Sequence, residues 1–258
     1  MSEKNILGEM TEEYIEDMLA RLAHNSSAIE GNTLSYNQTV SIVLNRTIPS
    51  GSSINIREFY EVENHRYALE YILEELKEKT SLDLYVIKEI NNKLMDHLNY
   101  NKGNFKTDGN AIKGADFETA SPQETPSLMY QWVENINFRI ANSKTEEEKI
   151  KVILEEHIKF ERIHPFSDGN GRTGRILMLY SMLEHNLDPF IIPVERREDY
   201  YDVLRSQNTE AFYHLIQPLQ IVETNRRKAF FNKEKSTIKE QKNPWERKMK
   251  EGKEGISR

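Results

Sequence analysis

The chain has 258 residues, a net charge of −7 and a hydrophobic share of 37%, a length that suits one large domain or two small ones. It contains no cysteine, which excludes disulfides, thiolate metal sites and a cysteine nucleophile. No apolar run approaches the roughly 18 residues of a membrane-spanning helix, and residues 1–5 lack the features of a secretory signal. We therefore expect a cytoplasmic protein with no membrane partner.

The charge is unevenly distributed along the chain. Residues 226–258 contain 12 Lys and Arg against 5 Asp and Glu, so this segment carries +7 and residues 1–225 carry −14. The negative charge of residues 1–225 makes nucleic acid an improbable partner, because binding to phosphates requires a positively charged surface. The basic segment is more typical of a solvated helix or a frayed end than of a nucleic-acid site.

Helical spacing of apolar residues runs through most of the sequence. Thr11 can cap a first helix that Gly31 ends, and Ser35 with Gln38 has the pattern of a capping box for a second helix. The same spacing predicts further helices, in chain order, at residues 59–76, 84–98, 127–140, 145–162, 171–185, 198–206 and 209–229.

Residues 101–126 interrupt this pattern with three glycines and two prolines. Such a composition favours turns and a short hairpin near residues 111–117. A loop of this length is uncommon in a compact domain unless it covers a functional site or is disordered. The predicted fold class is therefore all-α, a helical bundle with one short β-hairpin.

Residues 164–175 read His-Pro-Phe-Ser-Asp-Gly-Asn-Gly-Arg-Thr-Gly-Arg. Pro165 disfavours helical geometry at His164, so one helix ends there and the next begins near Gly171. The first turn of a helix presents unpaired N–H groups and a positive dipole end, which together bind anions. The glycines on either side of Asn170 let a phosphate approach the backbone closely.

Side chains within the same twelve residues complete a site for phosphate chemistry. Arg172 and Arg175 are three residues apart, which places two guanidinium groups on one face of the first turn. Asp168 offers a hard oxygen ligand that suits Mg²⁺ held jointly with phosphate oxygens. His164 can take a proton from an attacking hydroxyl. Together these residues are far more typical of a catalytic site than of a plain turn.

This segment resembles the motif of the Fic family, His-Pro-Phe-x-Asp/Glu-Gly-Asn-Gly-Arg-x-x-Arg, and matches it completely. The resemblance implies the Fic fold, with residues 56–225 as catalytic core, and a protein adenylyltransferase that moves AMP from ATP to a Ser, Thr or Tyr hydroxyl of a target protein. It implies that His164 is the general base and that Asp168 holds Mg²⁺. The ATP phosphates would be bound by the loop and by the two arginines, that is by Asp168, Gly169, Asn170, Gly171, Arg172, Thr173, Gly174 and Arg175.

The family resemblance also implies where adenine and the target bind. Tyr200, Tyr201 and Asn208 lie at the spacing at which related Fic proteins contact adenine, although ordinary helix packing explains the two tyrosines equally well. Residues 111–117 lie where the family places its flap, a hairpin that holds a target peptide by strand pairing.

Residues 26–32, Ser-Ser-Ala-Ile-Glu-Gly-Asn, match the inhibitory motif of the family. Ser26 and Glu30 are four residues apart and share a helix face, and an acid in the last turn needs a cationic partner. The resemblance implies that this partner is Arg175, which Glu30 would withdraw from ATP. Region 1–55 would then contain an inhibitory helix, and Glu30 could also assist removal of AMP from a modified target.

Alternatives to adenylyl transfer stay open at this point. A phosphotransferase of the Doc kind would use the same site, although that group carries Lys where this chain has Gly171. A nucleotide-binding regulatory module without turnover could use the basic segment 226–258 on nucleic acid, but no helix-turn-helix pattern follows Ile221. Self-modification, a homodimer, the target and the signal that releases Glu30 are not readable from the sequence.

Overall fold

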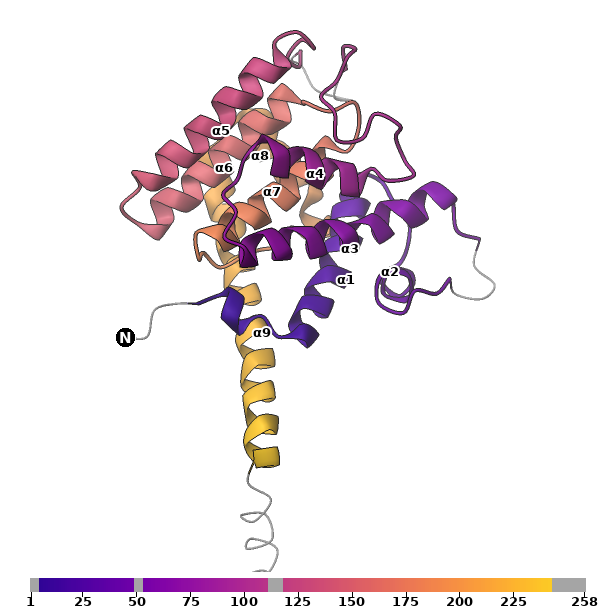
Figure 1. Cartoon of the computed structure of the whole chain (residues 1–258), viewed down its shortest axis with the longest axis vertical. Coiled ribbons are helices and arrows are strands. Elements are labelled where there is room, and N and C mark those ends of the chain that lie inside the picture. The colour runs from indigo at the N-terminus through magenta and orange to yellow at the C-terminus, as the bar shows by residue number, and fades with distance from the viewer. Residues whose placement is uncertain (1–4, 49–52, 111–117, 243–258) are drawn as a thin grey trace, which may run out of the picture.

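The structure, a computed structural model, is all-α as the sequence predicts (Figure 1). Its β-structure is a single bridge between Phe105 and Phe166 within the part of the chain that the structure describes. The hairpin predicted near residues 111–117 falls outside that part. The described residues are 5–48, 53–110 and 118–242.

Nine α-helices make up the fold within these ranges. Most begin and end close to the predicted limits. The helix that begins at Leu84 ends at Leu94 instead of residue 98, and the last helix continues to Lys242 instead of ending at residue 229. None of the helices in the described ranges is long and apolar enough to cross a membrane. The helices are α1 Glu12–Ile29, α2 Tyr36–Val43, α3 Ile56–Lys77, α4 Leu84–Leu94, α5 Thr125–Ala141, α6 Glu146–Ile163, α7 Asn170–Glu184, α8 Arg197–Ser206 and α9 Thr209–Lys242.

The predicted helix caps are present. The Thr11 side chain accepts a hydrogen bond from the backbone N–H of Tyr14 at the start of α1. Ser35 and Gln38 form the expected capping box at the start of α2. Each of these caps satisfies backbone N–H groups that a helix leaves unpaired at its first turn.

Helix α7 lies at the centre of the bundle (Figure 1). It packs against α6, α4, α3 and α1. Nearly all of its residues from Asn170 to Leu183 are buried, and these include the polar residues near its N-terminal end as well as the apolar residues after Arg175. The first turn of α7, which carries the motif, is therefore held by the core of the protein.

Helix α1 is fixed against the body by contacts far apart in sequence. It packs on α3, α2 and α9. The two carboxylate oxygens of Glu223 on α9 accept hydrogen bonds from Tyr14 at 2.8 Å and from Arg21 at 2.7 Å. These buried, charge-assisted bonds hold α1 along one side of α9.

The basic segment 226–258 begins inside α9, which continues without a break to Lys242. Its first cations are paired within the protein. Arg226 lies 2.9 Å from Asp17 of α1, and Lys233 lies 2.7 Å from Glu13. Arg227 is buried and forms ion pairs with both Glu9 and Asp188. Cations that are paired in this way add little to a surface that could attract nucleic acid.

Candidate active site

The turn between α6 and α7 has the backbone that the sequence predicts. His164 ends α6 in a left-handed conformation with φ 51°, and Pro165 follows it. Gly169 precedes α7 with φ 77°, a conformation that glycine adopts without strain. The six residues from His164 to Gly169 carry the chain from one helix to the next, and the N-terminus of α7 faces the turn.

The side chain of Asn170 closes this turn. Its amide oxygen accepts a hydrogen bond from the backbone N–H of Phe166, and its amide nitrogen donates to the Phe166 carbonyl, both at 2.8 Å. Asn170 is buried, so it acts here by fixing the shape of the loop. The backbone N–H groups of the loop remain as the groups that could bind a phosphate.

Two residues of the long loop 101–126 also hold the motif in place. Asn110 donates hydrogen bonds to the carbonyls of His164 at 3.1 Å and Phe166 at 2.8 Å. Lys106 donates from its backbone to Pro165 and from its ammonium group to the Ile163 carbonyl. Burial lowers the pKa of Lys106 to about 8. Lys106 and Asn110 thus hold one side of the motif, although the sequence did not identify these two residues.

His164 is held in a state that can accept a proton. Burial lowers the pKa of its imidazole to about 4, so the ring is neutral at pH 7. Its Nδ1 atom lies 3.3 Å from the carbonyl oxygen of Glu161. A proton on Nδ1 donates to this carbonyl and leaves the lone pair of Nε2 as the acceptor.

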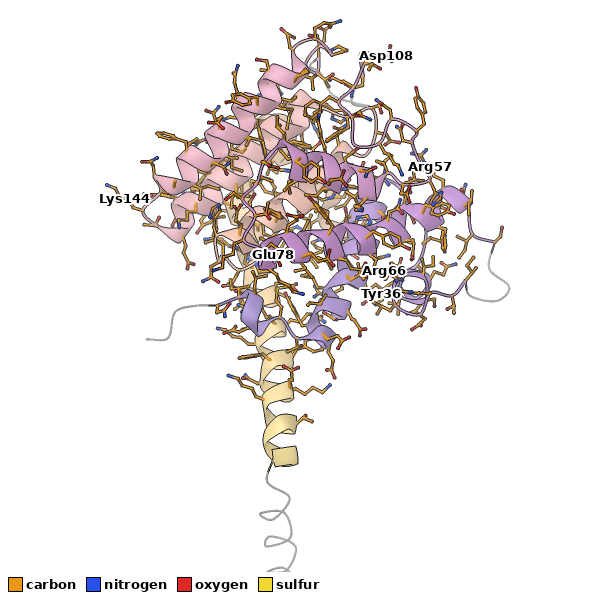
Figure 2. All side chains as sticks on the ribbon, in the orientation of Figure 1. Tyr36, Arg57, Arg66, Glu78, Asp108 and Lys144 are labelled. Atoms are coloured by element: carbon orange, nitrogen blue, oxygen red, sulfur yellow. The ribbon has the colours of Figure 1, made fainter. Side chains whose placement is uncertain are left out.

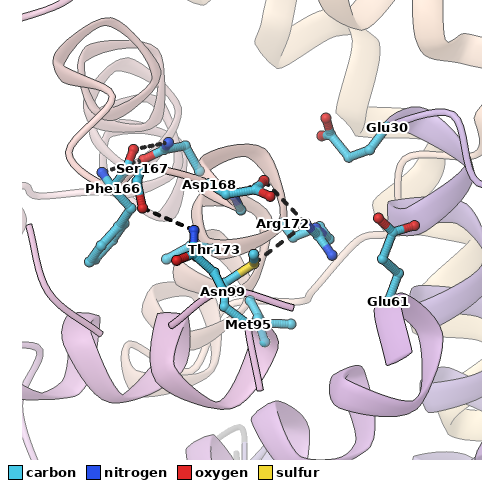
Figure 3. Close-up of polar contacts among 12 residues, drawn as sticks. Glu30, Glu61, Met95, Asn99, Phe166, Ser167, Asp168, Arg172 and Thr173 are labelled. Atoms are coloured by element: carbon cyan, nitrogen blue, oxygen red, sulfur yellow. Dashed lines mark hydrogen bonds and ion pairs between the residues drawn. The ribbon is translucent and has the colours of Figure 1, made fainter. Parts of the chain in front are cut away.

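Asp168 lies at the edge of the site, between two guanidinium groups. Figure 3 shows Asp168 and Arg172 reaching toward one another, with 3.5 Å between carboxylate and guanidinium. Arg57, in the first turn of α3 (Figure 2), lies 2.8 Å from the other carboxylate oxygen. Arg172 is buried and also contacts the Met95 sulfur, whereas Arg57 is half exposed. Arg57 is a site residue that the motif does not contain.

Asp168 suits Mg²⁺ better than a metal with an all-protein ligand set. Its carboxylate is one third exposed, so a hydrated cation can reach it. Within the described ranges no group of three His, Asp or Glu side chains is arranged to hold a metal ion. Mg²⁺ is commonly bound by one or two carboxylates together with substrate phosphates. The residues present therefore fit a metal that arrives with a nucleotide.

Arg175 faces the end of α1, as the resemblance implies. Its guanidinium donates to the Ser26 hydroxyl at 3.0 Å, to the Ser26 carbonyl at 2.9 Å and to the Glu30 carboxylate at 2.7 Å. Arg175 and Ser26 are buried, while the Glu30 side chain is about one third exposed. The ion pair with Glu30 further stabilises the charged guanidinium against its burial, and the pKa of Arg175 is raised.

Glycines in α7 make room for these carboxylates. A Cβ atom on Gly171 would collide with Glu30 Oε1 and would lie 3.0 Å from the Arg175 guanidinium. A Cβ atom on Gly174 would lie 2.7 Å from a carboxylate oxygen of Glu161. The lack of side chains at both positions is therefore what allows acidic groups from α1 and α6 to approach α7.

The remaining expected site residues lie in different surroundings. Tyr200 is fully buried: its hydroxyl is 2.8 Å from His157, and Arg175 lies over its ring at 5.8 Å. Tyr201 is half-buried and donates a hydrogen bond to the Ile29 carbonyl at 3.0 Å. Asn208 is exposed and accepts from a backbone N–H in the first turn of α9. Tyr201 and Asn208 are thus more accessible to a ligand than Tyr200.

Two further polar residues, Asn91 and His65, lie near the motif without belonging to it. Asn91 of α4 donates to the Asp168 carbonyl and to the Thr173 hydroxyl, each at 3.2 Å. His65 of α3 is buried near both arginines, and burial followed by repulsion from Arg172 lowers its pKa to about 3. Both residues occupy positions where the helical spacing predicts a buried apolar side chain. A polar residue at such a position is the sequence feature that could have identified them as part of the site.

Comparison with known proteins places this site in a family. Residues 81–182 match the model of the Fic/DOC family. The protein adenylyltransferase Fic of Drosophila grimshawi is 31% identical over 186 residues, which make up 72% of this chain and 37% of that protein. The same protein of Drosophila willistoni is 30% identical over 72% of this chain and 36% of its own length. The chain thus spans little more than a third of these relatives.

Solved structures show the same fold. Fic-1 from C. elegans superimposes with a TM-score of 0.69 and 25% identity, over 88% of this chain and 65% of that one. A Fic domain containing signaling protein from Bacteroides thetaiotaomicron superimposes with a TM-score of 0.67 and 24% identity, over 84% and 86% of the two chains. The match at residues 81–182 thus identifies a Fic/DOC family domain within this chain.

Proposed function

We propose that the chain is an ATP- and Mg²⁺-dependent protein adenylyltransferase that Glu30 inhibits. The observation that carries this proposal is the arrangement around the first two turns of α7, with the imidazole of His164 before them and Arg172 and Arg175 within them. The names of the Drosophila relatives, protein adenylyltransferase Fic, support transfer of the adenylyl group rather than of the γ-phosphate.

In the proposed reaction a target hydroxyl approaches His164 and the α-phosphorus of ATP. The hydroxyl proton passes to Nε2 of His164 as the oxygen forms a bond to the α-phosphorus. The bond from that phosphorus to the oxygen bridging to the β-phosphate breaks, and pyrophosphate leaves. Arg172 and Arg175 balance the charge on the β- and γ-phosphates, and the amides of the loop hold the remaining oxygens.

Asp168 would hold Mg²⁺ together with phosphate oxygens. When bound, the ion would neutralise part of the triphosphate charge. Arg57, which now lies 2.8 Å from Asp168, would give up this contact to the ion. Because Arg57 is half exposed, its guanidinium can move into solvent at little cost.

Glu30 would inhibit by competing with the γ-phosphate for Arg175. Its carboxylate already lies 2.7 Å from the guanidinium, and a triphosphate brought to the same place would meet a negative charge. ATP would then bind weakly, or in a pose that does not suit in-line attack. The same carboxylate could orient a water that removes AMP from a modified target.

Labelled ATP tests the proposal. The chain and its Glu30→Gly variant are incubated with a protein lysate, Mg²⁺ and ATP labelled at the α-phosphate. Label should enter protein, more strongly for Glu30→Gly, and should vanish when His164→Ala is added to that variant. Glu16→Gly is the matched control, because Glu16 is an exposed residue of the same helix.

Three outcomes would contradict the proposal. Label entering from γ-labelled ATP alone would indicate a Doc-like phosphotransferase. No covalent label from any variant, together with binding of ATP, would indicate a regulatory module. Equal labelling by the chain and by Glu30→Gly would support the transfer activity but contradict the inhibitory role of Glu30. Mass spectrometry of the labelled bands would separate self-modification from modification of a target.

A further inference from the structure

Lys106 holds the backbone on both sides of His164. Its ammonium group donates a hydrogen bond to the carbonyl of Ile163 at 3.1 Å, and its backbone N–H donates to the carbonyl of Pro165 at 2.8 Å. The carbonyl of His164 itself accepts from the side-chain amide of Asn110 at 3.1 Å. Three consecutive carbonyls therefore accept hydrogen bonds from the same loop.

The backbone at His164 is one that needs such support. Its φ of 51° lies in the left-handed region, which residues other than glycine keep only where their surroundings fix it. His164 follows the last residue of α6, and Pro165 after it has no N–H group with which to form a hydrogen bond. Since the backbone sets the direction of the imidazole, the contacts from Lys106 and Asn110 determine where Nε2 of His164 points.

The ammonium group of Lys106 uses all of its N–H groups. Besides the Ile163 carbonyl, it donates to Oδ1 of Asn110 at 2.8 Å and to the hydroxyl of Thr119 at 3.3 Å. A lysine ammonium has three donors, so each donor is matched by one oxygen. Lys106 is only 3% exposed, which leaves water little access to replace a lost partner.

The contacts of Lys106 are separate from those of the two arginines expected to bind ATP. Arg172 contacts Asp168, and Arg175 contacts Glu30. Within the described ranges none of these four side chains is a partner of Lys106. Loss of the ammonium group should therefore disturb the base and leave the two cations in place.

Burial also makes this ammonium group sensitive to pH. It lowers the pKa of Lys106 to about 8, so the proton is lost well below the pH at which an exposed lysine loses it. Among the described residues, the titratable side chain on which the charge of Lys106 acts is His164, which is already neutral at pH 7. The uncharged amine has two N–H donors and a lone pair for three oxygens, so one hydrogen bond must be lost.

We propose that Lys106 is a positioning residue, which fixes the imidazole of His164 for proton transfer through its hydrogen bonds to Ile163, Pro165 and Asn110. Lys106 acts through the backbone of His164 and not on the reacting atoms. Its effect on transfer rests on the proposed function, whereas its effect on the position of His164 does not.

The rate of transfer and the binding of ATP separate this role from a general loss of structure. In the Glu30→Gly background, Lys106→Met should lower the rate of label transfer at saturating ATP by roughly tenfold or more, because His164 is no longer held toward the acceptor hydroxyl. The dissociation constant of ATP should change less than about threefold, since Arg172 and Arg175 keep their contacts. An equal loss of ATP binding would indicate a merely structural role and contradict the proposal.

Lys88→Met is the matched control. The ammonium group of Lys88 lies 4.5 Å from the centre of the Phe105 ring, so this lysine contacts the same loop next to Lys106. Its substitution should leave the rate and the binding of ATP unchanged. A loss equal to that of Lys106→Met would overturn the specific role of Lys106.

The pH profile gives a readout that a merely structural role would not change. The rate of Glu30→Gly should fall above about pH 8, where Lys106 loses its proton. With Lys106→Met added the rate should be lower throughout and should show no such fall, because the titrating group is absent. The same fall in both proteins would contradict the proposal.

Thr119→Val is the second variant if Lys106→Met proves unfolded by circular dichroism. It removes one acceptor of the ammonium group and keeps the charge, and it should lower the rate of Glu30→Gly by roughly threefold without weakening ATP binding. An unchanged rate would contradict the proposal.

Crystal structures decide the position of His164 without any transfer. In Lys106→Met, or in Thr119→Val if the former is unfolded, the turn should leave the left-handed conformation at His164 and the imidazole should move from its present place. A backbone and ring unchanged from those of the parent chain would overturn the proposal. If Glu30→Gly transfers no label at all, the proposed function fails, whereas these structures still decide the role of Lys106.

Discussion

The Glu30 carboxylate and the Arg175 guanidinium lie 2.7 Å apart although 145 residues separate them in sequence. Ser26, one helical turn before Glu30, accepts a further hydrogen bond from the same guanidinium at 3.0 Å. Ser26 and Glu30 thus contact one cation, which belongs to the second turn of α7.

Ser26→Ala should activate the protein only in part. The substitution removes one hydrogen bond to Arg175, worth about 1 kcal/mol, and leaves the Ser26 carbonyl as acceptor. The rate of label transfer should therefore rise by roughly fivefold, well below the rise for Glu30→Gly. If the rate of label transfer by Ser26→Ala equals that of Glu30→Gly, the ion pair between Glu30 and Arg175 does not contribute more to inhibition than the hydrogen bond from Arg175 to Ser26, and the prediction is contradicted.

Gly171→Ala should release Glu30 without changing any charge. The new methyl group would occupy the place of Glu30 Oε1, a flexible group that can move away. Label transfer should rise, because Arg175 loses its carboxylate. The control is Gly171→Ala in the Glu30→Gly background, where the methyl group should give no further rise. A rise of the same size there would show that the methyl group acts on ATP directly.

Arg57→Gln should lower the Mg²⁺ concentration needed for ATP binding. The guanidinium competes for Asp168 from a half-exposed position, and exposed ion pairs contribute about 0.2–1 kcal/mol. The half-saturating Mg²⁺ concentration should therefore fall by up to about fivefold. Arg205→Gln, which breaks an exposed pair with Asp202 on α8, is the control and should have no effect.

The pH dependence of transfer should report a low pKa for His164. Burial lowers this pKa to about 4. The neutral imidazole accepts a proton above that value and is blocked below it, so kcat/KM of Glu30→Gly should stay level from neutral pH down to about 5 and then fall. Loss of activity near pH 6.5, with the fold intact by circular dichroism, would contradict a buried base.

The sequence predicted the parts of this site that are local. The turn at Pro165, the start of α7 and the shared face of Ser26 and Glu30 each depend on residues a few positions apart, for which helix geometry sets the outcome. The link from Glu30 to Arg175 was available only through the family resemblance, because it joins two helices that are distant in sequence.

Other parts of the site could not be predicted from local sequence patterns. Arg57 reaches Asp168 across 111 residues, and Asn110 reaches the His164 carbonyl across 54. Neither residue has a local pattern that marks it, since its role is set by the packing of α3 and of the long loop on α7. Likewise α9 extends past residue 229 to Lys242, and in this part Lys233 pairs with Glu13, a contact between segments distant in sequence.

The anchoring of α1 limits how the ion pair between Glu30 and Arg175 can open. Its first half is tied to α9 through Tyr14 and Arg21, which share Glu223, and through Asp17 and Arg226. A rigid swing of the whole helix would break all of these bonds at once. Unwinding of its final turn, next to Gly31, would break the contacts to Arg175 and the hydrogen bonds of Ser27 to Glu61 and of Tyr201 to Ile29, but would leave the bonds to α9 intact. A local fraying of a few residues is therefore less demanding than a movement of the whole helix as a way to free Arg175 from Glu30.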